Sequence, residues 1–95
     1  MLIVISYDVS TTDDGKKRLR KVAKLCQNYG VRVQNSVFEC NVDPAQWLML
    51  KNGLLKLYDS NLDSLRFYRL GSNYRGKIEY YGAKKSCDVE DTIIL

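Results

Sequence analysis

The feature that most constrains this chain is a continuous strand-like segment near its start, residues 2–7, which opens with an apolar run at residues 2–5 and ends at Asp8. The run is rich in β-branched residues, and such runs are typical of a central strand buried on both faces of a sheet. It is too short to cross a membrane, and it reaches Asp8 before a signal-peptide core could form. The sequence therefore predicts a first strand inside a globular domain, with Asp8 at its carboxyl end.

Two helices are predicted from apolar spacing and from end signals. In the first, apolar residues recur at helical spacing over residues 19–29, after several candidate N-caps at residues 10–13 and before Gly30. The second starts with Asp43 as N-cap, a proline at the first helical position, and Gln46 as capping-box partner. Its buried face is predicted to consist of Trp47, Leu50, Leu54 and Leu57, widened by Leu48 and Leu55.

The remaining apolar and aromatic segments are predicted to be strands. Residues 31–40 alternate and then change parity near residues 34–36, which indicates either one bulged strand or two short strands around a tight turn. Residues 64–70 and 77–81 are rich in strand-forming residues and predict a late pair of strands. This order, without a repeat or linker, predicts one ferredoxin-like α+β sandwich over residues 1–95, with two helices on one face of an antiparallel sheet.

The size and cysteine content of the chain limit the chemistry it can carry. A domain of 95 residues has little room for a deep pocket, so any chemistry is expected at the surface or at a subunit interface. Cys26, Cys40 and Cys87 form no CxxC pair, and there is no histidine, which disfavours a zinc site, a disulfide scaffold and histidine-dependent catalysis. These features indicate a reducing cytoplasm and no membrane partner.

Basic residues are segregated along the chain. Residues 16–32 contain seven basic side chains and no acidic one, and residues 66–85 contain six against Glu79. Such blocks are typical of a surface that binds a polyanion, and neighbouring tyrosines supply aromatic faces. Because no RNP1-like octamer is present, phosphate contact is predicted more strongly than base stacking on the sheet. The alternative is a solvated helix face, with the tyrosines serving as strand formers.

Asp8 is the candidate metal ligand. A carboxylate at the end of a strand can bind Mg²⁺ or Mn²⁺, because these hard ions prefer oxygen ligands. One carboxylate makes a poor site, whereas a twofold dimer that joins two Asp8 side chains would share one ion and hydrolyse phosphodiesters without histidine. The alternative is a strand-end aspartate that caps the Ser-Thr-Thr loop after it.

Three motifs of the sequence resemble one known family: Tyr7-Asp8-Val9 after the apolar strand, Arg-Leu-Arg-Lys-Val-Ala at residues 18–23, and Arg-Val-Gln-Asn-Ser-Val-Phe-Glu at residues 32–39. Over essentially its whole length the chain is similar to the small CRISPR-associated endonuclease family, the ferredoxin-like partner of the CRISPR integrase in spacer acquisition. The segments 43–47 and 65–68 further resemble the type I-C branch.

The resemblance implies a homodimer in which a C-terminal strand, residues 91–95 with Ile93 and Ile94, pairs with the sheet of the other subunit. It implies cleavage of double-stranded DNA or single-stranded RNA with Mg²⁺ or Mn²⁺, with Asp8 as metal ligand and catalytic residue. Tyr7 is the second candidate catalytic residue, and Tyr7 and Phe38 would shape the interface. Arg18, Arg20 and Arg32 match motif positions and would neutralise phosphate, and the charge pattern adds Lys16, Lys17 and Lys24.

Several functions fit these features. Within the family, the chain is either a nuclease that acts with the integrase or a catalytically silent DNA-binding scaffold in the same complex. Outside it, a ferredoxin-like regulatory domain would bind a metabolite at its dimer interface, without the salt dependence that phosphate contact produces. A small toxin-like ribonuclease that needs no metal is disfavoured by the lack of histidine.

Overall fold

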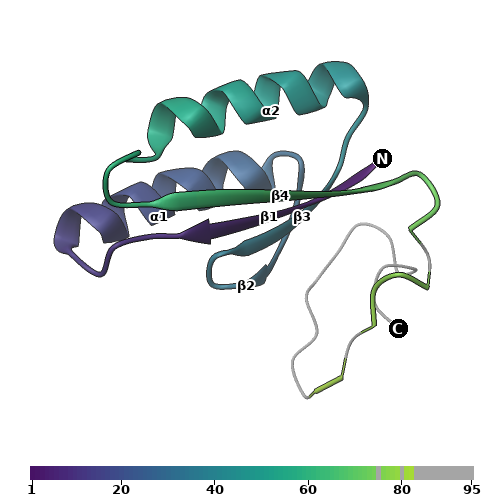
Figure 1. Ribbon diagram of the computed structural model, residues 1–95, viewed down its shortest axis with the longest axis horizontal. Helices are drawn as coiled ribbons and strands as arrows, with labels where there is room; N and C mark the ends of the chain where they lie inside the picture. The colour runs from purple at the N-terminus through teal and green to yellow at the C-terminus, as the bar shows by residue number, and fades with distance from the viewer. Residues whose placement is uncertain (75, 80, 83–95) are drawn as a thin grey trace.

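The computed structural model describes residues 1–74, 76–79, 81 and 82. Its elements are β1 (Leu2–Asp8), α1 (Asp13–Gln27), β2 (Gly30–Gln34), β3 (Val37–Asn41), α2 (Pro44–Leu57) and β4 (Ser64–Gly71). The strands form one sheet in the order β2-β3-β1-β4, with antiparallel pairs throughout, and both helices cover the same face (Figure 1). The predicted ferredoxin-like α+β fold is confirmed. Neither helix is long and apolar enough to cross a membrane.

Each helix begins at a capping residue. The Thr12 hydroxyl accepts a hydrogen bond from the Gly15 N–H at 3.1 Å, which caps α1. At α2 the Asp43 carboxylate accepts from the Gln46 N–H at 2.7 Å, and the Gln46 side chain accepts from the Asp43 N–H at 3.0 Å. The capping box predicted from the sequence is therefore confirmed.

Residues 31–40 form two strands that meet at a turn. β2 and β3 pair in antiparallel fashion on either side of residues 35–36, and the register shifts between Arg32 and Gln34. The change of parity in the sequence thus corresponds to a turn with a neighbouring irregularity. Gly30 is the first residue of β2, with two residues between it and the end of α1, and a Cβ at this position would overlap the Glu39 carbonyl oxygen of β3. The close approach of these two strands therefore requires glycine.

The core lies between the helices and the sheet, and it is built from inward-facing residues of β1, β3, α1 and α2. The Trp47 ring of α2 meets the Phe67 ring of β4 edge-on, with centroids 4.9 Å apart. Leu48 and Leu55, predicted to widen the buried face of α2, are instead 59% and 44% exposed. Each follows a core residue by one position, a rotation of about 100° that turns its side chain outward.

The structure forms one of the two predicted late strands. β4 matches the first and pairs with β1 at the edge of the sheet. The prediction of a strand at 77–81 is wrong for the residues described there, since none of 77–79 and 81 belongs to a strand. Ile78 instead packs with Leu70 on Leu2 and Tyr74, in a separate small cluster. The predicted C-terminal strand at 91–95, with Ile93 and Ile94, lies outside the described residues.

Candidate functional site

Asp8 is the last residue of β1, lies opposite Ser64 of β4, and is exposed. Because side chains alternate along a strand, Asp8 projects to the face opposite that of Tyr7, away from the helices. Here it borders a hollow of about 560 Å³. The polar residues around this hollow include Ser6, Thr11, Asn35, Ser36, Arg66 and Tyr68.

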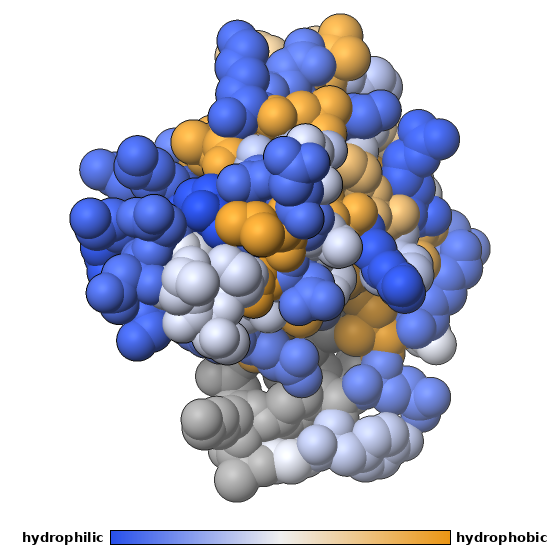
Figure 2. All heavy atoms as spheres, turned by 60° about the vertical axis from the view of Figure 1, so that its left-hand side comes forward, coloured by the Kyte–Doolittle hydropathy of each residue, from blue (hydrophilic) through white to orange (hydrophobic). Residues whose placement is uncertain are grey.

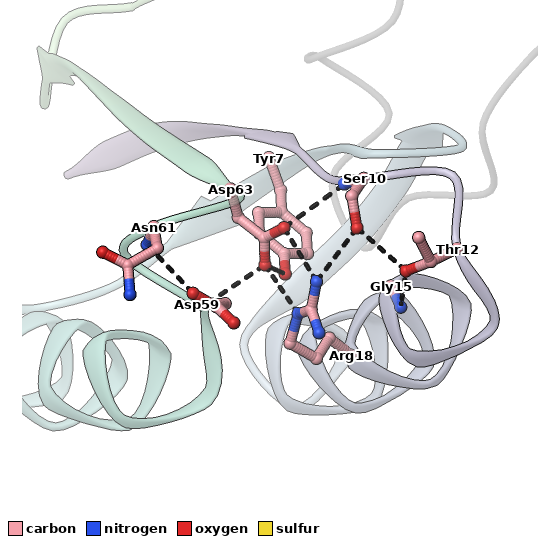
Figure 3. Close-up of polar contacts among 8 residues, drawn as sticks. All are labelled: Tyr7, Ser10, Thr12, Gly15, Arg18, Asp59, Asn61 and Asp63. Atoms are coloured by element: carbon pink, nitrogen blue, oxygen red, sulfur yellow. Dashed lines mark hydrogen bonds and ion pairs between the residues drawn. The ribbon is translucent and has the colours of Figure 1, made fainter.

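On the other side of the strand, Tyr7 is anchored by a buried aspartate that links two loops (Figure 3). The Tyr7 hydroxyl donates a hydrogen bond to Asp63 Oδ2. Asp63 also accepts from Arg18 Nε at 2.7 Å, from Arg18 Nη2 at 3.1 Å, from the Ser10 N–H at 3.2 Å and from the Asp59 N–H at 3.1 Å. These five residues, Tyr7, Ser10, Arg18, Asp59 and Asp63, are called the Asp63 cluster below.

The Asp63 cluster fixes the chain on both sides of Asp8. It holds Tyr7 by its side chain and Ser10 by its backbone, so the end of β1 and the loop after it are tied to the start of β4. In the loop after β1, the Ser10 N–H donates to the Asp63 carboxylate, and Thr12 is the residue that caps α1. This result removes the alternative in which Asp8 is the capping residue of the loop and leaves Asp8 facing the hollow.

The charges in the cluster reinforce one another. The Arg18 guanidinium holds the pKa of the Asp63 carboxyl well below its usual range and outweighs the opposing effect of burial. In return, Asp63 raises the pKa of Arg18. Burial, assisted by the hydrogen bond to Asp63, raises the pKa of Tyr7 to about 12. Near neutral pH Tyr7 is therefore a protonated hydrogen-bond donor, and the structure assigns it an anchoring position behind Asp8.

The phenol of Tyr7 is expected to ionise near pH 12, and its ionisation should destabilise the fold. An ordinary tyrosine has a pKa of about 10, so this contribution to the free energy of unfolding is complete below pH 10 and is lost as the pH rises towards 12. Phenolate absorbance measured against pH should show a late step that is absent from Tyr7→Phe and retained in Tyr81→Phe. A wild-type titration that Tyr7→Phe leaves unchanged at high pH would contradict this assignment.

The predicted phosphate-binding residues separate into two groups. Lys16, Lys17, Arg20 and Lys24 are exposed on α1, and hydrophilic side chains cover much of the molecule on the side where α1 begins (Figure 2). Arg18 points inward instead: its side chain is 17% exposed and its guanidinium is bound by Asp63. Its Nε and Nη2 groups donate to Asp63 and to Ser10 Oγ, so in this structure Arg18 serves as a structural contact, and its predicted contact with phosphate stays a prediction.

Arg32 and Phe38 lie together in the β2–β3 hairpin. Arg32 donates to the Asn35 carbonyl at 2.8 Å and to Asn35 Oδ1 at 3.1 Å, and its guanidinium lies 5.7 Å from the centre of the Phe38 ring. Arg32 thereby holds the turn that borders the hollow. Phe38 is fully buried in the core of the subunit. This corrects the expectation that its side chain is presented at a subunit interface.

The donors around Asp8 fit a hard divalent cation by type. The hollow is lined by Asp8 and by the hydroxyl-bearing residues Ser6, Thr11 and Ser36. Mg²⁺ prefers such oxygen ligands, keeps several waters, and is commonly bound through one or two carboxylates and substrate phosphates. Within the described part of the chain, no three His, Cys, Asp or Glu side chains gather to hold a metal. Among the residues that the structure describes, Asp8 is the one carboxylate that lines the hollow, so water, substrate or a second subunit would supply the other ligands.

Sequence reasoning missed the central residue of this arrangement. Asp63 lies in the connection between α2 and β4, outside any motif, and its partners Tyr7 and Arg18 are 56 and 45 positions away. The sequence indicated that Arg66 belongs to a basic block suited to phosphate contact and that Tyr68 is an aromatic residue of the predicted strand 64–70, but it did not place either residue beside Asp8. The register of β4 on β1 places them in the hollow, and that register is a tertiary property.

This sheet order, with two helices on one face and an exposed carboxylate where the first strand ends, defines a small ferredoxin-like protein with an acidic site beside a basic helix. The family described as CRISPR associated protein Cas2 matches residues 1–78, and the chain belongs to this family.

Two curated relatives are similar in sequence to the whole of this chain. It is 60% identical over 96 residues to the CRISPR-associated endoribonuclease Cas2 of Chlorobaculum tepidum and 61% identical over 96 residues to the CRISPR-associated endonuclease Cas2 of Halalkalibacterium halodurans, with complete coverage of both partners in each case. The crystal structure of Streptococcus pyogenes Cas2 superposes with a TM-score of 0.80 at 52% identity, covering 86% of this chain and 100% of that one.

Proposed function

We propose that this protein is a homodimeric endonuclease that uses Mg²⁺ or Mn²⁺ to cleave phosphodiester bonds in single-stranded RNA or double-stranded DNA, and that it acts with the CRISPR integrase in spacer acquisition. The observation that carries the proposal is the exposed Asp8 carboxylate, held at the rim of a hollow that also contains Arg66. The names of the relatives, endoribonuclease and endonuclease, support phosphodiester cleavage as the reaction.

Residues in and next to the hollow would have different roles in phosphodiester cleavage. Asp8 would hold the cation, which when bound supplies charge neutralisation at the phosphate and a more acidic water. Arg66 supplies a guanidinium that can bind a phosphate oxygen through paired hydrogen bonds. The Asp63 cluster keeps the end of β1 in one position through Tyr7 and Ser10, so the carboxylate is presented from a fixed backbone.

A second subunit would complete the site. One Asp8 offers one carboxylate, and Asp8 projects from the face of the sheet that the helices leave uncovered. A twofold axis passing near this face would bring two Asp8 side chains towards one ion, because an isologous interface places the same residue from each copy about the axis. The basic face of α1 would then be repeated in the dimer and could follow a nucleic-acid backbone on both sides.

The test compares cleavage by wild-type protein and by Asp8→Asn, using protein shown to be dimeric by light scattering. Labelled single-stranded RNA and double-stranded DNA are incubated with Mg²⁺, with Mn²⁺ and with EDTA. Metal-dependent cleavage is expected in the wild type and should be abolished in Asp8→Asn. Asp14→Asn, the same change at an exposed position in the first turn of α1, should leave cleavage intact. Cleavage that survives both EDTA and the Asp8 change would refute the proposal.

A DNA-binding scaffold without catalysis is the second candidate. It is favoured by the exposed basic residues of α1, which can contact phosphates without any help from Asp8. If neither the wild type nor Asp8→Asn cleaves nucleic acid, and both bind DNA with an affinity that falls steeply with salt, the results favour a scaffold function over a nuclease function.

A further inference from the structure

The outer face of α2 carries apolar side chains at positions where a surface helix is normally polar. A helix on the surface of a domain directs apolar residues to the core and charged residues to solvent. α1 follows this rule, with Lys17 and Lys24 among its exposed residues. α2 departs from it, because Leu48, Met49 and Leu55 are exposed. α2 therefore has apolar residues on two sides, and only one of these sides packs on the core of the subunit.

The exposed residues of α2 have the spacing along which one helix packs on another. Leu48 and Leu55 are seven positions apart, so they lie almost in line after two turns. Ala45 and Asn52 are also exposed, and each lies three positions before one of these leucines. Alternating steps of three and four residues form the seam of a helix pair. These four residues, Ala45, Leu48, Asn52 and Leu55, are called the α2 seam below.

Lysines on both flanks of the α2 seam indicate the charge of its partner. Lys51 comes directly before Asn52 of the seam, and Lys56 comes directly after Leu55. Both lysines are exposed, and α2 contains no Asp or Glu. Residues at such flanking positions form ion pairs across a helix pair and thereby select the partner. A helix that fits the α2 seam is therefore expected to carry acidic residues beside its apolar ones.

The α2 seam stays accessible in the proposed homodimer. α2 covers the side of the sheet opposite to that of Asp8, so a dimer joined through the uncovered side would display one seam on each outer surface (Figure 1). Two such seams packed on each other would place lysine against lysine in either orientation, which disfavours a second copy. Two leucines also make a narrower apolar face than that of helices that lie on a membrane.

We propose that the α2 seam is a docking surface for an amphipathic helix of a partner protein. Apolar side chains of that helix pack on Leu48 and Leu55, and acidic side chains beside them pair with Lys51 and Lys56. The contact goes beyond the proposed nuclease, because it uses neither Asp8 nor the side of the sheet on which Asp8 lies. The homodimer would carry two such helices, one on each subunit.

The probe is a fluorescent synthetic peptide designed as an amphipathic helix, with leucine at the seam positions and glutamate on both flanks. Repulsion between glutamates keeps this peptide from pairing with itself. A second peptide has the same composition in shuffled order and measures attraction by charge alone, and a third has lysine on both flanks. In titrations at physiological salt, wild type should bind the glutamate-flanked helix at least about tenfold more tightly than the shuffled peptide.

Two alanine variants test the apolar part of the contact. Leu48→Ala and Leu55→Ala should each weaken binding of the glutamate-flanked helix by about 10- to 50-fold, because each removes three carbon atoms that the contact would bury. Leu62→Ala is the matched control, since Leu62 is 59% exposed, like Leu48, but lies in the loop after α2. It should bind the peptide like wild type.

Reversal of the two lysines tests the charge of the contact. The double variant Lys51→Glu with Lys56→Glu should prefer the lysine-flanked helix, with a change of about tenfold in the ratio of the two affinities. Lys77→Glu reverses an exposed lysine outside α2 and should leave that ratio unchanged.

Four results would overturn the proposal. The first is equal binding of the glutamate-flanked and shuffled peptides, or binding that Leu48→Ala leaves unchanged. Light scattering that shows a larger oligomer in wild type than in Leu48→Ala would assign the seam to a second copy. Capture by phosphatidylserine vesicles that Leu48→Ala abolishes would assign it to a membrane. Displacement of the probe by a synthetic peptide with the sequence of residues 83–95 would assign it to the chain's own C-terminal segment.

Discussion

Asp63→Ala is expected to lower the free energy of unfolding by about 3–5 kcal/mol, because it breaks a buried ion pair from one side. The Arg18 guanidinium would lose both hydrogen bonds to a carboxylate whose own side chain is fully buried. The buried Tyr7 hydroxyl and the backbone N–H groups of Ser10 and Asp59 would lose the same acceptor. Since small domains are stable by only about 5–15 kcal/mol, this loss is a large fraction of the total.

The measurement is urea unfolding of wild type, Asp63→Ala and Asp63→Asn, with Asp8→Asn as the matched control. Asp8 is an exposed aspartate next in sequence to a member of the cluster, so its neutralisation should change stability by no more than about 0.5 kcal/mol. Equal effects at positions 8 and 63 would show that the Asp63 cluster does not hold the fold together. The free energy of unfolding of Asp63→Asn should lie between those of wild type and Asp63→Ala, because asparagine keeps the shape of the side chain but removes its charge.

The contribution of Asp63 should also vanish in acid. Its pKa is lowered in the folded protein, so its stabilising effect is complete above the ordinary aspartate pKa of about 3.9 and is lost as the pH falls below that value. The stability difference between wild type and Asp63→Asn should therefore be largest near neutral pH and shrink below about pH 4. A difference that grows in acid would contradict the ion pair as its cause.

Gly15→Ala is expected to destabilise the protein by about 2–3 kcal/mol, although alanine is the better helix former. Gly15 lies in the first turn of α1, where the loop from β1 passes over it. A Cβ there would overlap the Ser10 carbonyl oxygen and lie 2.7 Å from Ser10 Oγ. The loop would have to move, and it carries the Ser10 groups that bind Asp63 and Arg18.

Gly53→Ala provides the matched control, because it makes the same change inside the other helix. A Cβ at Gly53 would lie 2.8 Å from Cδ2 of Leu25, the far end of a flexible side chain that can rotate away. The helix-propensity gain of about 1 kcal/mol then offsets the repacking, and the net change should stay within about 1 kcal/mol. Thermal unfolding of both variants decides the matter, and a Gly15→Ala protein as stable as wild type would exclude the close approach of the loop.

Local signals in this sequence predicted local structure well. The Asp43–Gln46 capping box, the amphipathic α1 and the apolar β1 each depend on residues that are neighbours along the chain, and all are present. The strand expected at 77–81 was wrong for the described residues 77–79 and 81, because strand propensity alone does not form a strand without a pairing partner. Ile78 found its apolar contact on Leu2 and Tyr74 instead.

The site was predictable only in part, for a related reason. Asp8 could be placed at the end of β1 because the strand itself was evident in the sequence. That Arg18 points to Asp63, while Arg66 faces the hollow, depends on how the α2–β4 connection returns to β1. Arg18 and Arg66 are both arginines, yet one contacts a buried aspartate and the other lines the hollow. This difference depends on tertiary contacts, which residue spacing along the chain does not reveal.

The position of β1 in the sheet has a consequence for synthesis. β1 is made first, yet it ends up between β3 and β4. One of its edges can pair once β3 has emerged, but the other waits for β4, whose residues pair with β1 from more than fifty positions away. Until then the nascent chain exposes an unpaired apolar edge, which is the kind of surface that pairs with other chains. Pairing of β4 is therefore the step that covers the second edge of the apolar β1 and leaves the more polar β4 at the edge of the described sheet.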